Sequence, residues 1–311
     1  MKYGLLDYLV CPDCKAPFEL EVDSEDGGEI RAGRLVCKKN KCVFKIDKYI
    51  PRFVDADSYA DTFSKQRLYV RRHFKHYKED TSGDEIFLPT TQFSRDQLKQ
   101  GVTLEIGCGY GRFLDVIDRL GGEVIGVDLS THSIELAQDF VGSRKNVHLV
   151  QCDLFRLPFA LGQFPRIFSI GVLHHTPDTR AAFQALVPYL EKGGEIAIWV
   201  YPPELNRSVD RWRHVTTKIP ANWLYVWCII NEVAFSWIRG LPGGWRFGWI
   251  IPGGALGKRP FWLRVVGDFD ALSPEFAHTH TGSELKEWFL ESGLVDVKLL
   301  PRSSSAKGRM P

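Results

Sequence analysis

The sequence lacks the features that would assign the protein to a membrane, to the secretory pathway or to a strongly charged partner. Its most apolar run, 224–230, stops at Asn231, far short of the roughly 20 residues of a membrane-spanning helix. No secretory signal is visible, because Asp7 interrupts the first apolar stretch and no small-residue cleavage site follows it. Lys and Arg number 40 and Asp and Glu 38, so the formal net charge of +2 indicates no particular partner. We therefore expect a cytoplasmic protein with reduced thiols.

Cysteines are few and unevenly placed. Four of the seven lie within the first 42 residues, as the pairs Cys11-x-x-Cys14 and Cys37-x4-Cys42. An odd cysteine count in a reducing compartment argues against a disulfide framework and for a metal site. Thiolates at such short spacings converge on one ion, and four protein ligands leave no open catalytic position. Residues 1–54 are therefore predicted to form a zinc-ribbon module whose four cysteines bind one structural zinc.

A regular alternation of apolar strands and helices begins after residue 100. It predicts an α/β fold with right-handed crossovers and a mostly parallel sheet covered on both faces. The expected strands are 102–106, 123–128, 147–152, 166–172 and 195–201, and the expected helices are 111–120, 131–140 and 179–190.

Three segments depart from that alternation. Residues 55–100 are polar and predict a helical linker that covers the cofactor site. Residues 202–270 hold seven of the nine tryptophans and predict a helical insert within the domain 101–311. Near the end, Thr281 and Glu284 form a capping box for a helix, and a final strand is expected at 295–300.

The strongest chemical signal is Glu105-x-Gly107-x-Gly109-x-Gly111, which connects the first strand to a helix. Glycines there let the backbone approach a ligand that any side chain would touch. A dinucleotide fingerprint needs a further glycine where Arg112 stands, so a pyrophosphate cradle is the poorer interpretation.

The ends of the next strands carry further polar groups. Asp128 ends the second strand, where a carboxylate accepts both hydroxyls of a ribose. Asp153-Leu154 follows the third strand, in position to meet an adenine ring. The fourth strand ends at Gly171 and leads to His174-His175.

In these motifs, residues 100–300 resemble the class I S-adenosylmethionine-dependent methyltransferases. The resemblance implies a Rossmann-like seven-stranded sheet with one antiparallel edge strand, which 295–300 matches. The ribbon resembles the small zinc-ribbon activator protein of tRNA and protein methyltransferases. The cofactor contacts implied are Glu105, Gly107, Cys108, Gly109, Gly111, Asp128, Leu129, Asp153, Leu154 and Gly171.

Methyl transfer requires a base for the acceptor proton, and histidine suits that role near neutral pH. The resemblance favours His175 over His174; the alternative is that both only orient their loop. His278 and His280 are candidates from the opposite wall, with exposed structural histidines as the alternative. From the insert, Trp223 and Trp227 are the expected acceptor contacts, as part of a lid; the alternative is that they fill the insert's own core.

These observations predict metal-independent methyl transfer to oxygen or carbon of a small, hydrophobic or lipid-linked acceptor, without a nucleic-acid partner. The tryptophan-rich insert also suits contact with a membrane surface. Two alternatives stay open: an RNA methyltransferase that uses the ribbon as its reader, and a non-catalytic scaffold with the cofactor fold.

Overall fold

The computed structural model describes residues 1–54, 82–206, 209–239, 241 and 261–311. Their strands form one sheet in the order β1-β2-β3-β4-β7-β6-β5-β8-β9-β11-β10. The strands are β1 (Phe18–Asp26), β2 (Glu29–Cys37), β3 (Val43–Asp47), β4 (Ile50–Arg52), β5 (Val102–Ile106), β6 (Glu123–Asp128), β7 (Val147–Gln151), β8 (Phe164–Ile170), β9 (Leu190–Trp199), β10 (Val295–Leu299) and β11 (Ser305–Arg309).

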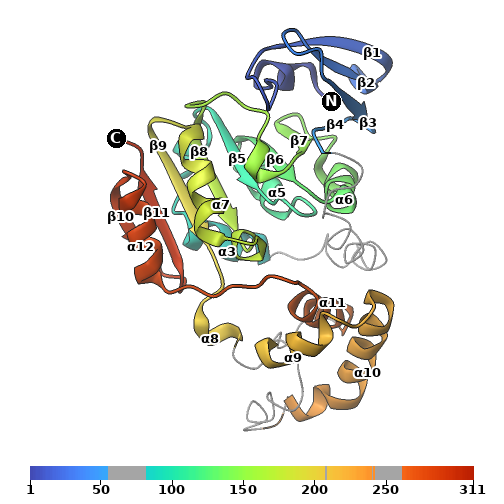
Figure 1. Ribbon diagram of the computed structural model, residues 1–311, viewed down its shortest axis with the longest axis vertical. Coiled ribbons are helices and arrows are strands. Elements are labelled where there is room, and N and C mark those ends of the chain that lie inside the picture. The colour runs from blue at the N-terminus through green and yellow to red at the C-terminus, as the bar shows by residue number, and fades with distance from the viewer. Residues whose placement is uncertain (55–81, 207–208, 240, 242–260) are drawn as a thin grey trace.

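The central part of the sheet is parallel, as predicted. Strands β7, β6, β5, β8 and β9 pair parallel, and an α-helix connects each consecutive pair except β7 and β8 (Figure 1). One face packs against α7 and α12, and the other against α3, α5 and α6. The helices are α3 (Ser82–Thr91), α4 (Arg95–Leu98), α5 (Arg112–Arg119), α6 (Thr131–Val141), α7 (Thr179–Leu186) and α12 (Gly282–Glu291).

The strand count and the antiparallel strand differ from the prediction. The sheet has eleven strands among the described residues, because the four ribbon strands continue it beyond β7. The antiparallel strand is β11, which lies between β9 and β10. The predicted strand 295–300 is β10, and it occupies the edge. Ser305–Arg309 shows no apolar alternation, so only its backbone pairing with β9 and β10 defines it as a strand.

The N-terminal ribbon is joined to the domain by backbone pairing and by a shared core. Arg52 of β4 pairs in parallel with Gln151 of β7. Val10 N donates a hydrogen bond to Pro158 O at 2.9 Å. Apolar side chains of both parts, including Leu5 and Phe159, belong to one buried cluster. Ribbon and domain therefore form one folded unit.

The insert forms a helical layer at the end of the molecule opposite the ribbon (Figure 1). Its buried cluster includes Leu136 of α6, with Tyr110 of the glycine loop packed against it, so the layer covers the carboxyl edge of the sheet. Residues 207–208, 240 and 242–260 of the predicted insert, and residues 55–81 of the predicted linker, lie outside the described residues. The helices are α8 (Pro203–Asn206), α9 (Val209–Thr216), α10 (Ala221–Arg239) and α11 (Phe261–Leu272).

Within the described part of the chain, no helix combines the length and the apolar character needed to cross a bilayer.

Candidate active site

An open cavity lies at the carboxyl ends of β5, β6, β7 and β8, where open α/β sheets bind their ligands. Its empty volume is about 790 Å³, with the solvent at its mouth included. Most of the predicted cofactor residues reach it. The lining residues are Ile106, Gly107, Gly109, Val127, Asp128, Leu129, Ser130, Ser133, Cys152, Asp153, Leu154, Gly171, Val172, His175 and Thr176.

Glycines shape the floor of this cavity. Gly107 has a φ of +75°, and a Cβ added there would lie 2.4 Å from Val172 Cγ2. Gly109 also has a positive φ, +57°, but its Cβ position has no atom within 4 Å. A side chain at Gly109 would therefore require a strained backbone and would enter the open space. The loop thus keeps room for a ligand against the main chain, as predicted.

Asp128 is fixed at the cavity wall by two backbone amides. Gly109 N donates to its Oδ2 and Ser130 N to its Oδ1, both at 2.8 Å. A carboxylate offers about four lone-pair positions, which suits contact with these amides and with two ribose hydroxyls together. Asp128 therefore has acceptor positions left that could bind ribose hydroxyls, as its predicted role requires.

Glu105 lies behind the glycine loop in β5 and is 2% exposed. Its Oε2 has no hydrogen-bond partner among the described residues. Burial raises the pKa of this carboxyl well above its ordinary value, while Arg112 acts in the opposite direction. Glu105 does not line the cavity, and its unpaired carboxyl oxygen suits a nearby cationic group.

The other predicted cofactor residues divide into two groups. Asp153 and Leu154 line the cavity, and Asp153 accepts a hydrogen bond from Phe155 N at 2.9 Å. Cys108 does not line it, because its side chain is buried in the core beside α5 and α6. Gly111 begins α5 with a φ of +90°, and an added Cβ would lie 2.9 Å from Val141 Cγ2. Gly111 therefore serves helix packing.

His174 and His175 form a short 3-10 turn after β8, so both rings lie on the same side, 4.1 Å apart between centroids. His175 lines the cavity, and its Nδ1 is 2.8 Å from Phe276 O. Because a carbonyl only accepts, Nδ1 carries the proton and Nε2 has the lone pair. His174 is buried against Tyr201, with centroids 3.8 Å apart, and burial lowers its pKa well below the ordinary value.

His278 and His280, predicted to face the acceptor from the opposite wall, lie beside these two histidines but do not line the cavity. His278 N donates to His174 O at 3.0 Å, and His280 N donates to Tyr201 O at 2.9 Å. The chain thus brings four histidines to one edge of the sheet, although only His175 lines the cavity.

The two tryptophans predicted to contact the acceptor lie elsewhere. Trp223 is 69% exposed on α10. Trp227 packs against Trp212 within the insert, with ring centroids 5.9 Å apart. The reason is the orientation of α10, which directs Leu224 and Cys228 into the insert's core.

Several lining residues were missed from the sequence, among them Ser130, Ser133 and Thr176. Ser130 begins α6 and accepts a hydrogen bond from Ser133 N at 3.2 Å. The sequence signal that could have identified Ser130 was its position two residues after Asp128. Thr176 carries no comparable motif.

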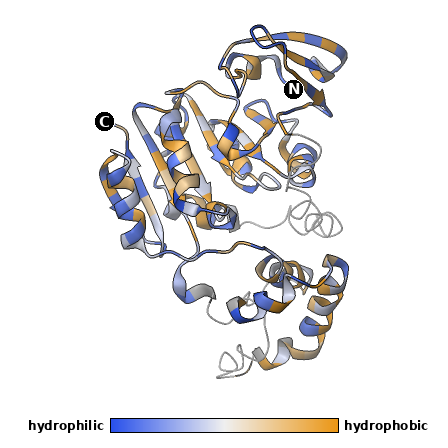
Figure 2. Cartoon of the chain, in the orientation of Figure 1, coloured by the Kyte–Doolittle hydropathy of each residue, from blue (hydrophilic) through white to orange (hydrophobic). Residues whose placement is uncertain are grey.

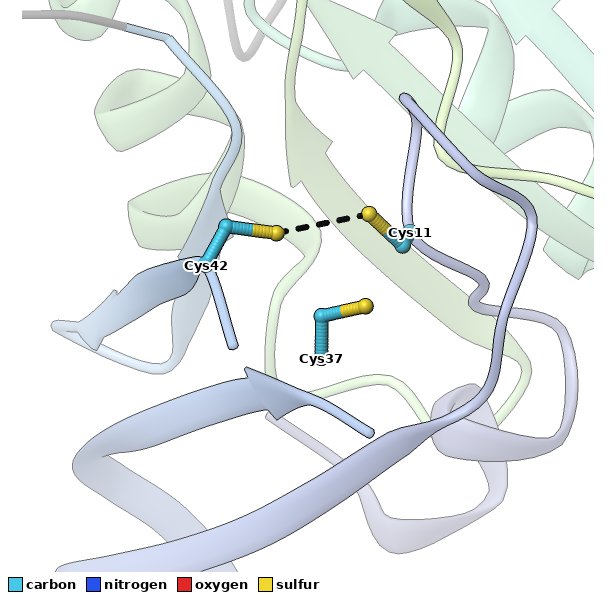
Figure 3. A group of neighbouring side chains, drawn as sticks. All are labelled: Cys11, Cys37 and Cys42. Carbon is cyan, nitrogen blue, oxygen red and sulfur yellow. Dashed lines mark hydrogen bonds between the residues drawn. The ribbon is translucent and has the colours of Figure 1, made fainter. Parts of the chain in front are cut away.

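The four ribbon cysteines gather as predicted. The Sγ atoms of Cys11, Cys37 and Cys42 all lie within 4.8 Å of one another (Figure 3). Cys14 Sγ lies 3.4 Å from Cys37 Sγ and completes the group. Ligands at about 2.3 Å from one tetrahedral zinc would stand about 3.8 Å apart, so this donor set fits a closed structural site.

A chain of polar contacts joins the ribbon to the cavity wall. Arg52 donates to Gln151 Oε1 at 2.7 Å. Gln151 Nε2 in turn donates to Leu129 O and Thr131 Oγ1, both at 2.9 Å. Arg52 also pairs with Glu135 of α6 at 3.2 Å. The ribbon therefore supports the turn that carries Leu129 into the cavity.

Both parts of the chain match known protein families. Residues 104–198 match the family described as "Methyltransferase domain", and residues 2–48 match "Trm112p-like protein". The magnesium protoporphyrin IX methyltransferase of Synechocystis PCC 6803 is a similar structure, with a TM-score of 0.46, 13% identity and coverage of 81% of this chain and 95% of that one.

Three curated relatives each match less than half of the chain. The "Probable tRNA methyltransferase 9B" of Mus musculus is 29% identical over 47% of this chain and 31% of its own length. The "tRNA (carboxymethyluridine(34)-5-O)-methyltransferase alkbh8" of Xenopus tropicalis is 33% identical over 38% and 18%. The "Ubiquinone biosynthesis O-methyltransferase" of Albidiferax ferrireducens is 30% identical over 34% and 41%. This chain thus spans less than half the length of each.

Two of these three relatives are tRNA methyltransferases by name, so the predicted absence of a nucleic-acid partner finds no support among them. The two family matches do confirm the predicted resemblance to S-adenosylmethionine-dependent methyltransferases and to their small zinc-ribbon activator. Residues 104–198 are therefore a methyltransferase domain, and the ribbon that shares its core is a Trm112p-like module.

Proposed function

We propose that the protein binds S-adenosylmethionine in this cavity and transfers its methyl group to an acceptor at the carboxyl edge of β8 and β9. One observation carries the proposal: a single cavity unites the glycine loop, the Asp128 carboxylate and His175. Asp128 would hold the ribose, Asp153 and Leu154 the adenine, and Glu105 the α-ammonium group.

The chain's own contribution to the reaction is positioning, water exclusion and proton transfer. The bound cofactor supplies a sulfonium methyl group. His175 would accept the acceptor's proton at Nε2, because Phe276 O fixes the proton on Nδ1. The same hydrogen bond orients the ring toward the cavity.

The acceptor we favour is a small hydrophobic or lipid-linked molecule methylated on oxygen or carbon. The position of the insert supports this, since its apolar cluster packs against Tyr110 beside the cofactor loop. A second candidate is tRNA, which the names of two relatives favour.

Methyl-labelled S-adenosylmethionine separates these acceptors. The protein would be incubated with a total lipid and metabolite extract and with total tRNA, and label would be counted in each fraction. We expect label in organic-soluble product. Ribonuclease-sensitive label in the RNA fraction alone would instead establish the second candidate.

The base role of His175 has a separate test. His175→Ala should slow methyl transfer about 10²- to 10⁴-fold while cofactor affinity is retained. His214→Ala, on the exposed side of α9, is the matched control. Equal rates for the two variants would rule out His175 as the base.

A further inference from the structure

The helix α10 exposes apolar side chains to solvent, although its buried side also contains two polar side chains. Apart from Asn222, every exposed side chain described on this helix is apolar. The face inside the insert includes Asn231, 3% exposed, and Glu232, fully buried. Figure 2 shows the hydrophobic colour along α10 at the end of the molecule opposite the ribbon. The exposed fractions are Trp223 69%, Val226 43%, Ile230 56%, Val233 67% and Trp237 64%.

These five residues, which we call the α10 stripe, follow one another at alternating steps of three and four. Such spacing aligns them along one side of a helix. The stripe spans the fourteen residue steps from Trp223 to Trp237, a length of about 21 Å at about 1.5 Å per step. It is therefore a continuous apolar surface.

Polar contacts lock the helix in this orientation. Glu232 accepts a hydrogen bond from Arg264 Nε at 2.8 Å, and Asn231 donates to Asp268 Oδ2 at 3.3 Å. Both partners lie on α11. Rotation of α10 to hide the stripe would expose the apolar core of the insert and break these buried contacts, which is costly. The outward apolar side is thus a property of the packed insert.

Exposed cationic side chains lie on or just beyond the helix next to α10. The neighbouring helix α9, which touches α10 through the Trp212–Trp227 contact, carries exposed Arg211, with Lys218 just beyond its end and half-exposed Val215 between them. By contrast, the acidic side chains Glu232 and Asp268 are fully buried. Among its described residues, the insert therefore presents exposed cationic groups on or just beyond the helix next to the one that carries the stripe.

We propose that the α10 stripe docks on the surface of an anionic lipid bilayer, with α10 in the plane of the interface. Helices that bind in this way present an apolar side with aromatic residues and adjacent Lys or Arg, and do not cross the bilayer. Tryptophan at both ends of the stripe matches the preference of indole for the lipid–water boundary. This docking stands independently of methyl transfer, although it would bring the carboxyl edge of the sheet close to a lipid-linked acceptor.

Vesicle sedimentation tests the proposal on the full chain. Unilamellar vesicles of phosphatidylcholine and phosphatidylglycerol, 3:1, are compared with vesicles of phosphatidylcholine alone. We expect at least tenfold stronger partitioning to the anionic vesicles at low salt. The double variant Trp223→Ser/Trp237→Ser should lose at least tenfold, since it removes the two largest apolar groups. Arg211→Ala and Lys218→Ala should each lose about fivefold, on anionic vesicles only.

The matched control is Leu161→Ser/Leu290→Ser, which removes two side chains of similar exposure, 62% and 55%, outside the insert. It should sediment like the unaltered protein. S-adenosylmethionine affinity, measured on every variant, reports folding and cofactor binding separately from docking. Equal partitioning of the stripe variant and the control would overturn the proposal. So would a dimer in gel filtration that the stripe variant converts to monomer without any vesicle binding, because the occupant would then be a second copy.

Discussion

Asp128 is the single side chain on which cofactor affinity should depend most. Asp128→Ala removes the carboxylate that we propose holds the ribose, and charge-assisted hydrogen bonds contribute about 1.5–3 kcal/mol each. We therefore expect S-adenosylmethionine affinity to fall at least about tenfold in calorimetric titration. Because Asp128 also accepts from Gly109 N and Ser130 N, thermal unfolding of the variant is the control for loop damage. Unchanged affinity would show that the ribose is held elsewhere.

His174 should make the protein sensitive to acid. Its folded-state pKa lies well below the ordinary 6.5, so below pH 6.5 the unfolded chain binds the proton and the folded chain does not. The stabilising contribution is therefore complete above pH 6.5 and declines as the pH falls, by up to about 1.4 kcal/mol per pH unit. Denaturant unfolding at pH 7.5 and 5.5 should show a smaller decline for His174→Phe than for His214→Phe. If the unfolding free energies of the two variants fell equally between these pH values, His174 would not be the source of the acid sensitivity.

At the scale of elements, β4 supports the turn after β6. Arg52 reaches Leu129 and Thr131 through Gln151. Arg52→Ala should lower S-adenosylmethionine affinity about three- to tenfold, since loss of about 1 kcal/mol of hydrogen bonding loosens that turn. Arg34→Ala, which removes an exposed ion pair with Glu21 on the ribbon, is the control. If both variants bind the cofactor equally well, the ribbon does not act through Arg52.

At the scale of the whole molecule, zinc removal should destabilise the methyltransferase domain as well as the ribbon. Leu5, Leu9 and Phe18 share a buried cluster with Phe159 and Phe164, so the two parts should unfold together. Chelator, or Cys37→Ser, should lower the midpoint of a single thermal transition by at least about 5 °C. Metal analysis confirms the loss of zinc. Two separate transitions, with the later one unchanged, would show that the domain is independent.

The local features of the chain were accessible from the sequence because they depend on neighbouring residues. Strands β5 to β9 lie within a few residues of their predicted positions. Asp178 caps α7 and Thr281 caps α12, as their side-chain chemistry predicts. The placement of Gly107, Gly109 and Asp128 at one cavity followed from the rule that ligands bind at the carboxyl ends of parallel strands. The cytoplasmic location stays a prediction.

Other features required the tertiary structure. Apolar spacing predicted that α10 is a helix, but its buried side was decided by Arg264 and Asp268 on α11, which hold Glu232 and Asn231 inside. His174 and His175 lie beside His278 and His280, which are about a hundred residues later in the chain, so no local pattern could predict that they meet.

The sequence by itself determined the strands β5 to β9, the two cysteine pairs and the glycine loop, since each depends on residues a few positions apart. Only the tertiary structure decided that β4 joins β7 and that β11 enters between β9 and β10. Backbone hydrogen bonds make these pairings, and they leave no pattern in the side chains. For this reason, only the tertiary structure shows that the strands of the ribbon and of the domain form one sheet.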